Sequence, residues 1–288
     1  MRRFMRENRY LIVNADDFGY FPCVSQGISE AIHAGAVTAT SIMANRPGIN
    51  QQLALLTERP RADLGVHLNL TFGLPLTHVL RAHLPHGLFP SKFWWALRTA
   101  LGGRLLRDTG DELRAQISKC VGAGLSICFL NSHEHVHMLP ALFNTVTEIA
   151  QEFQIPFVRH SRPDWRFSTG ASAALRNGLL QALYTFQYNR RRKAQVPLMH
   201  GASVSGRIDL RYLNALIRSL RQGAVVELMC HPGLCTASDV DNSKLATYHA
   251  WRQEYEVLTS NAFAQMCARE NVKRARFSDL LQRDLVAH

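Results

Sequence analysis

Short apolar runs alternate with amphipathic stretches along most of the chain. Runs that are typical of buried strands occur at 10–17, 37–45, 64–71, 125–137, 155–161 and 224–233. Helical spacing of apolar residues predicts helices at 24–35, 51–60, 111–124, 140–154, 162–195 and 210–221 and around 254–270. This alternation indicates βα units and a parallel sheet. We expect an α/β single-domain (β/α) barrel of roughly six to eight parallel strands, with the active site at the strand carboxyl ends.

One region, residues 73–110, interrupts the alternation. It contains several prolines and glycines and the aromatic, basic segment SKFWWALR (91–98). The region is either an insertion packed against the barrel mouth, or a lid or surface for an apolar substrate tail. No Gly-rich or Ser-rich linker divides the chain, so we expect one domain over 1–288.

Composition narrows the class of protein. The 288 residues are 47% hydrophobic and 19% charged, which argues for a compact globular protein and against disorder. No uncharged apolar run reaches about 18 residues, so no membrane-spanning helix is expected. The six cysteines lack CxxC spacing and are expected to be free thiols of a reduced, cytoplasmic protein. Cys230, His231 and Cys235 supply only three zinc ligands, which argues against a structural zinc site.

The formal net charge of +11 raises the question of partners. Strong positive charge is common in nucleic-acid-binding proteins. Here the basic residues are dispersed, with small clusters at 2–3 and 189–195, and no nucleic-acid motif surrounds them. An anionic membrane surface or a lipid-linked substrate explains dispersed charge equally well. We therefore expect no nucleic-acid partner, and a cytoplasmic location with peripheral association at the inner membrane surface as an open alternative.

Polar residues follow several predicted strands. Because the carboxyl ends of parallel strands meet on one face, we expect these side chains to converge there. They are Asp16, Asp17, His67, Asn69, Asn131, His133, His135, His137, Arg159, His160 and His231.

The stretch NSHEHVHMLP (131–140) is the most distinctive of these segments. If it is extended, its three histidines lie on one side; a turn before Pro140 would instead bring His133 and His137 together. Packing does not require three imidazoles, so we interpret the stretch as one wall of a metal pocket, with His133 as the preferred ligand. A structural or pH-sensing role stays open, and Asp16 and Asp17 also fit a solvated turn.

Several motifs, in order, resemble the YdjC family of carbohydrate deacetylases. They include NADDFG (14–19), GVHLNLTFGLP (65–75), NSHEHVHMLP (131–140), ELMCHPG (227–233) and RQEYEVLTS (252–260). The nearest likeness is to the chitooligosaccharide and hopanoid-biosynthesis branches. The resemblance implies a metal-dependent hydrolase that removes the N-acetyl group from an N-acetylglucosamine-type sugar, either lipid-linked or a soluble chitooligosaccharide.

The resemblance also implies roles for individual residues. Asp16 becomes the general base and His231 the general acid, and one divalent metal is held by Asp17, His67 and His133. Zinc or magnesium suits this set, and manganese or cobalt is also compatible. Many family members have an aspartate at the position of Asn131; asparagine can still orient a ligand histidine but supplies no charge.

The residues themselves leave further roles open. Arg159, His137 and Asn69 are expected to contact substrate, although Arg159 is also suited to keeping Asp16 ionised. A phosphoesterase or sugar isomerase would use similar residues, but acids near the cluster are few. A non-catalytic glycolipid-binding protein is a third alternative. It would have no need for a separate acid and base.

Overall fold

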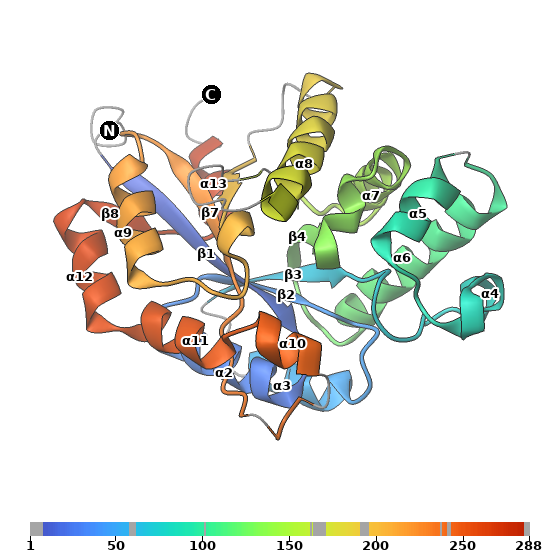
Figure 1. Cartoon of the computed structure of the whole chain (residues 1–288), viewed down its shortest axis with the longest axis horizontal. Coiled ribbons are helices and arrows are strands. Elements are labelled where there is room, and N and C mark those ends of the chain that lie inside the picture. Colours follow the sequence, from blue (N-terminus) through green and yellow to red (C-terminus); the bar gives the residue numbers. More distant parts are fainter. Residues whose placement is uncertain are drawn as a thin grey trace.

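A computed structural model describes residues 8–57, 62–100, 102–161, 163, 171–190, 196–236, 238–240 and 243–284. Its centre is one parallel sheet with the strand order β5-β4-β3-β2-β1-β7-β6, and an eighth strand, β8, pairs with the first residues of β1 (Figure 1). The strands are β1 (Arg9–Phe18), β2 (Ala39–Ile42), β3 (Asp63–Leu68), β4 (Ile127–Ser132), β5 (Phe157–Val158), β6 (Leu198–His200), β7 (Val225–Cys230) and β8 (Val272–Arg274). The expected parallel α/β architecture is confirmed, as a curled half-barrel: within the described residues no pairing joins β5 to β6.

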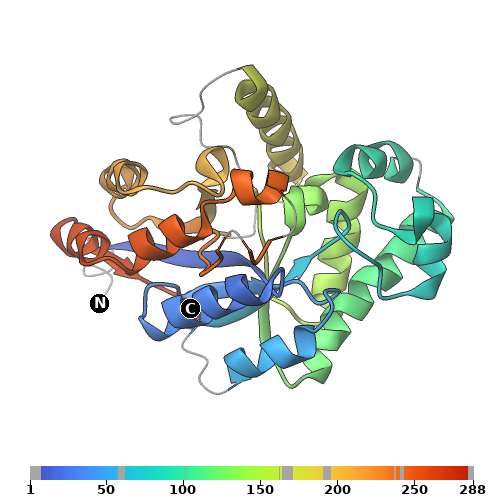
Figure 2. The same cartoon turned by 60° about the horizontal axis from the view of Figure 1, so that its bottom comes forward.

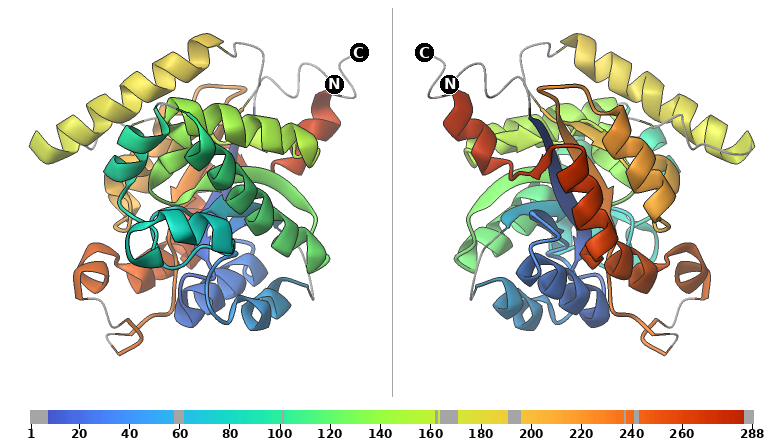
Figure 3. Two further views of the ribbon diagram at one scale, coloured as in Figure 1. Left: turned by 90° about the vertical axis from the view of Figure 1, so that its right-hand side faces the viewer. Right: turned by 90° about the vertical axis from the view of Figure 1, so that its left-hand side faces the viewer.

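Helices flank this sheet (Figures 2 and 3). They are α2 (Pro22–His33), α3 (Ile49–Thr57), α6 (Arg104–Gly122), α7 (Pro140–Glu152), α8 (Ala171–Arg190), α9 (Leu210–Ser219), α10 (Ser243–Tyr248), α11 (Trp251–Thr259), α12 (Asn261–Arg269) and α13 (Ser278–Asp284). The single helix expected around 254–270 is two, because Ser260 caps α12 by accepting from the Phe263 N–H at 3.2 Å. Among the described helices, none has the length and apolar character that a membrane crossing requires.

The inward face of the sheet changes from apolar to polar along the strands. Side chains two residues apart share one face of a strand. A small apolar cluster of Ile12, Ala39, Phe129, Phe157, Ala275 and Phe277 fills the amino-terminal end of the barrel. Two residues further along each strand the side chain is polar: Asn14, Ser41, Asn131 and Arg159. The carboxyl end is therefore lined by buried polar groups, as the strand-end rule predicts.

Region 73–110 is mostly helical. It contains α4 (His78–His83), a short 3-10 turn (Pro85–Gly87) and α5 (Lys92–Thr99), and then the start of α6. Trp95 anchors α5 because its ring is fully buried and its Nε1–H donates to the Leu70 carbonyl at 2.5 Å. The buried Glu112 carboxylate accepts from the backbone N–H groups of Leu76 and Thr77 at 3.0 and 2.8 Å. These contacts fix the region beside the carboxyl ends of β3 and β4.

Candidate active site

Two consecutive acids at the end of β1 point to different partners. The pairing of β1 with β2 is irregular between Ala15 and Phe18, and Asp17 has a left-handed backbone with φ of 69°. Aspartate tolerates this conformation better than most residues, and such strain is frequent at functional sites. As a result, Asp16 faces Arg159 and Asp17 faces two histidines, and both carboxylates are almost completely buried.

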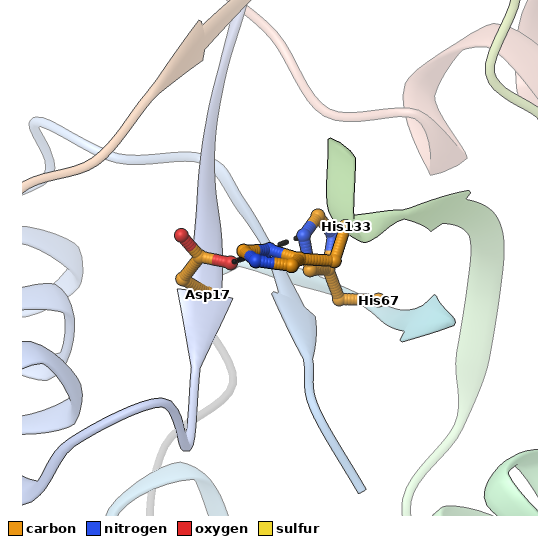
Figure 4. Close-up of side chains that lie close together, drawn as sticks. All are labelled: Asp17, His67 and His133. Carbon is orange, nitrogen blue, oxygen red and sulfur yellow. Dashed lines mark hydrogen bonds and ion pairs between the residues drawn. The ribbon is translucent and has the colours of Figure 1, made fainter. Parts of the chain in front are cut away.

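Asp17, His67 and His133 form a compact cluster from β1, β3 and the end of β4 (Figure 4). Asp17 Oδ1 lies 3.1 Å from His67 Nε2 and 3.0 Å from His133 Nδ1. One ligand atom from each residue lies within 4.8 Å of the others, close enough to share one ion. The structure thus brings the three sequence-predicted ligands together.

Asn131 orients one of these histidines. Its Nδ2 donates to Asp16 Oδ1 at 2.9 Å and to Ser41 Oγ at 3.1 Å, so its Oδ1 accepts the N–H of His67 Nδ1 at 2.8 Å. This bond leaves the other ring nitrogen, Nε2, directed at the Asp17 carboxylate at 3.1 Å. The donor set, one carboxylate and two imidazoles, therefore fits a divalent metal such as zinc.

Electrostatics around Asp17 favour its ionised form. Burial by itself would raise the pKa of Asp17, but His133 and His67 hold it well below the usual value. Burial lowers the pKa of His133, and the Asp17 carboxylate more than offsets this, so the pKa of His133 is raised. The Asp17 carboxylate is therefore ionised, and it faces the two imidazole nitrogens with which it could share a cation.

A second buried cluster holds Asp16. Arg159 donates from Nη1 to Asp16 Oδ2 at 2.6 Å and from Nη2 to Asp16 Oδ1 at 2.8 Å. Arg159 Nε and Nη2 also donate to Glu227 Oε1 at 2.9 and 2.5 Å, and Asn14 donates to the same oxygen at 2.7 Å. Burial alone would raise the pKa of Asp16, yet the Arg159 guanidinium lowers it far below its ordinary value. Burial alone would lower the pKa of Arg159, but the two carboxylates raise it.

Glu227 was not among the site residues expected from the sequence. A signal was present, because an acid stands in the middle of the otherwise apolar strand VVELMC. A charge at such a position is rarely buried without a partner. The partner here is Arg159, which directly follows β5 and donates to Glu227 of β7.

His231 follows β7 and lies at the edge of the cluster of Asp17, His67 and His133. Its Nε2 is 3.9 Å from Asp17 Oδ2, and its buried Nδ1 has no partner within the described residues. The backbone N–H of His231 donates to Glu254 Oε2 at 2.5 Å, and Glu254 Oε1 accepts from the Ile208 N–H at 3.1 Å. Glu254, also not among the site residues expected from the sequence, lies within the RQEYEVLTS motif and holds the His231 loop in place.

The expectation that all six cysteines are free thiols is wrong, because Cys23 and Cys235 form a disulfide. This bond joins the start of α2 to the loop that carries His231. A pairing across 212 residues leaves no trace in cysteine spacing. Cys235 is consequently no zinc ligand, and Cys230 is a buried thiol.

The NSHEHVH segment is not extended. Residues 133–138 form a 3-10 turn in which Glu134 and His135 have φ of 51° and 57°. Of the two conformations left open from the sequence, the structure therefore excludes the extended one. The turn does not bring His133 and His137 to a common partner either: His133 reaches Asp17, and His137 Nε2 donates to the Arg159 carbonyl at 2.9 Å.

His135 and His137 are occupied by neighbouring groups. His135 Nδ1 lies 2.9 Å from Ser161 Oγ, and His137 Nδ1 lies 2.5 Å from Ser132 Oγ. Burial lowers the pKa of His137 to about 3, so the ring is neutral. His160 packs edge-on against Phe143.

Asn69 shapes the loop after β3. Its Oδ1 accepts from the N–H groups of Thr71 and Phe72, both at 3.0 Å. Its Nδ2 donates to Asn45 Oδ1 at 2.9 Å and to the Phe72 carbonyl at 2.6 Å. An amide side chain offers two donors and two acceptor sites, so these four bonds use its whole capacity.

The fold and the site together define a class: a parallel α/β half-barrel with a buried carboxylate–imidazole cluster at its strand ends. Within that class, the chain belongs to the family of YdjC-like proteins, whose model matches residues 10–269.

Two curated relatives match nearly the whole chain, and a third matches about half of it. A carbohydrate deacetylase of Brevibacillus brevis is 29% identical over 270 residues, which is 94% of this chain and 99% of the relative. One from Vibrio cholerae is 27% identical over 277 residues, covering 96% of this chain and 98% of the relative. A third, from Geobacillus stearothermophilus, is 38% identical over 157 residues, which is 54% of this chain and 62% of the relative.

A solved structure shares the fold. It is that of a proposed cellobiose-phosphate cleavage protein from Enterococcus faecalis V583, with a TM-score of 0.68 and 23% sequence identity. The match covers 95% of this chain and 99% of the other. At this identity the likeness supports the architecture alone.

Proposed function

We propose that the protein is a metal-dependent carbohydrate deacetylase that removes the acetyl group from an N-acetylglucosamine-type sugar. The observation that carries the proposal is the meeting of Asp17 Oδ1 with two imidazole nitrogens at 3.0 and 3.1 Å in a largely buried cluster. Relatives named carbohydrate deacetylase, matched over more than nine-tenths of this chain, support the reaction class.

Asp17, His67 and His133 would hold one divalent ion. Zinc or magnesium is the first choice, and manganese or cobalt is compatible with the same ligands. Held by three protein ligands, such an ion supplies Lewis acidity toward the acetyl oxygen and toward a water molecule. Asn131 supports the site by keeping the Nε2 lone pair of His67 directed at it.

Asp16 is proposed as the group that accepts a proton from the attacking water. Its Oδ1 already accepts from Arg159, Ser41 and Asn131, but its Oδ2 accepts only from Arg159 Nη1 among the described residues. A carboxylate oxygen has two acceptor sites, so Oδ2 keeps one for water. Arg159 keeps Asp16 ionised and oriented, and we propose this as its role, in place of direct sugar binding.

His231 is proposed as the acid that protonates the departing amine. Its Nε2 lies 3.9 Å from Asp17 Oδ2, at the side of the cluster formed by β7. An amine without this proton is a very poor leaving group, and a positioned acid contributes roughly 100- to 10,000-fold to the rate. Glu254 keeps the His231 backbone in place through its bond to the N–H.

Of the other residues expected at the substrate, His137 and Asn69 have no donor or acceptor left for a sugar. We propose that both position the active-site loops: His137 bonds to Ser132 and to the Arg159 carbonyl, and Asn69 holds residues 69–72.

We further propose that the acetylated sugar is lipid-linked, as in a hopanoid glycoside, and is processed at the inner membrane surface. The formal charge of +11 and the exposed aromatic, basic segment at 91–98 support this choice. Soluble chitooligosaccharides are the competing substrate class, and glycolipid binding without catalysis is the competing function.

The decisive experiment incubates metal-loaded protein with an N-acetylglucosaminyl lipid and, separately, with a chitooligosaccharide. Mass spectrometry should show the loss of one acetyl group from the lipid. The His231→Ala variant should still bind the metal but turn over at least about 100-fold more slowly. Acetyl loss from the soluble sugar alone would reverse the substrate choice. Glycolipid binding without acetyl loss would refute the deacetylase.

A further inference from the structure

Helix α5 presents an apolar face to solvent. Phe93, Ala96, Leu97 and Ala100 are all exposed, and their spacing places them on one side of the helix. Phe93 is 68% exposed and Leu97 is 74% exposed. The outward face of a surface helix normally carries polar and charged residues, because its apolar stripe is turned toward the core. In α5 the core side is already provided by the buried Trp95 and Thr99.

Exposed apolar side chains are concentrated in the sequence segment that contains this helix. Of the twelve large hydrophobic residues that are exposed in the described part of the chain, five fall between Leu74 and Leu97. The other three of these five are Leu74, Val79 and Leu88. Single exposed apolar residues need no explanation, but a concentration of them marks an interaction surface.

An open groove runs beside the apolar face. It has a volume of about 460 Å³ and is lined by His83, Leu84, Pro85, Trp94, Arg98 and Leu105. Its walls are mostly apolar, and the Arg98 guanidinium lies over the Trp94 ring at 5.5 Å. The groove therefore combines a surface for hydrocarbon with one cation.

The segment that contains α5 is rich in positive charge. Residues 74–108 contain the cations Arg81, Lys92, Arg98, Arg104 and Arg107 and a single acid, Asp108. Within the described residues, Arg98 and Arg107 take part in no ion pair, and both are exposed. Unpaired cations beside an apolar face are typical of surfaces that bind anionic lipids.

The surface lies close to the candidate active site. Lys92 Nζ, at the start of α5, pairs with Glu134 Oε1 at 2.9 Å, and Glu134 directly follows His133. In the whole molecule, α4 and α5 lie at the end opposite α12 (Figure 1). The start of α5 thus contacts the segment that carries His133.

We propose that the α5 face and its groove dock the protein onto an anionic phospholipid bilayer. Phe93 and Leu97 enter the acyl region, and Arg98, Arg104 and Arg107 contact lipid phosphates. The inference deepens the proposed function, since it provides the surface from which a lipid-linked sugar reaches the pocket. Its test does not depend on catalysis.

Vesicle co-sedimentation provides that test. Wild-type protein should sediment with vesicles of equal parts phosphatidylcholine and phosphatidylglycerol. It should bind much less to pure phosphatidylcholine, and high salt should release it. The Phe93→Ser/Leu97→Ser double variant should bind at least about tenfold more weakly. The matched control is Leu55→Ser/Val121→Ser, which removes two exposed apolar residues from α3 and α6 and should bind as the wild type does.

Two further measurements test the role of the arginines and distinguish membrane binding from dimer formation through α5. The Arg98→Gln/Arg107→Gln variant should lose part of the phosphatidylglycerol preference. Light scattering should give the same molar mass for the wild type and the Phe93→Ser/Leu97→Ser variant. A dimer that only the wild type forms would show that a second copy covers α5, and would overturn the proposal.

The proposal would also fail if wild-type protein ignored anionic vesicles at low salt, or if the Phe93→Ser/Leu97→Ser variant bound them normally. Deacetylation assays of the same variant with a soluble substrate keep this failure distinct from that of the proposed function. If the protein binds anionic vesicles but deacetylates no acetylated sugar, the docking surface is supported and the deacetylase function is refuted.

Discussion

Two clusters of buried charge lie side by side at the carboxyl ends of the strands, and they are built differently. In the Arg159 cluster, the cation is shared between Asp16 and Glu227 at 2.6 and 2.5 Å. In the Asp17 cluster, a carboxylate faces the imidazole nitrogens of His67 and His133. The first cluster contains a guanidinium that binds both of its carboxylates, whereas the second contains only groups that could also serve as metal ligands. Adjacent acids, Asp16 and Asp17, thus take on opposite tasks.

The sharpest test of this contrast is Asp17→Asn. The variant should lose its metal and about a thousandfold in kcat/KM, because the several kcal/mol that a metal supplies to the transition state would be gone. Its metal-free stability should fall only slightly, because His133, whose pKa the carboxylate raises, can lose its proton when that carboxylate is removed. Metal analysis, kinetics and urea denaturation measure the three quantities.

Asp111→Asn, at an exposed position in α6, is the control for the Asp17 variant and should change none of them. Full metal occupancy in Asp17→Asn would contradict the assignment of this cluster.

The opposite behaviour is expected for Arg159→Met. Methionine fills a similar space but leaves Asp16 and Glu227 buried without their cation. Breaking such a pair lowers the free energy of unfolding by about 3–5 kcal/mol. Urea denaturation of metal-free protein measures this loss, and Arg114→Met, which breaks an exposed pair with Glu152, should lose only about 0–1 kcal/mol. Equal losses in both variants would show that the Arg159 cluster contributes little.

A smaller effect is expected at Asn131, the residue that bonds to both clusters. Asn131→Ala removes the acceptor that fixes the His67 tautomer, and loss of such a partner typically weakens metal binding by about 10–100-fold. Calorimetric titration with the metal gives the change in Kd. Asn50→Ala, at an exposed position, is the matched control. An unchanged Kd in Asn131→Ala would show that the bond from Asn131 to His67 does not contribute to metal binding.

The longer strands and helices could be predicted from the sequence. The strands β1, β3, β4 and β7 and the helices between them have a clear pattern of apolar and polar residues. The strands β6 and β8 could not be predicted, because three-residue strands have too few positions to display a pattern. The strand-end rule brought Asp17, His67 and His133 together correctly, because parallel pairing fixes which ends meet.

Other features depended on tertiary structure. The opposed directions of Asp16 and Asp17 follow from one left-handed residue, which no spacing rule reveals. Glu227 and Glu254 look like ordinary strand and helix residues until the groups that they bind are located. The Cys23–Cys235 bond joins positions that come close only after the sheet has curled.

The bracing of the loop after β7 has a consequence for substrate range. Besides the disulfide and the Glu254 contact, the Gly233 N–H bonds to the Trp251 carbonyl at 3.1 Å, and the Leu234 N–H bonds to the Cys23 carbonyl at 3.0 Å. A Cβ at Gly27 would come within 2.5 Å of Gly233, so the helix and loop backbones are in direct contact. A loop held at these points is expected to move little when a substrate binds. Changes in substrate range among relatives, and attempts to engineer selectivity, should therefore concentrate on other loops at the strand ends.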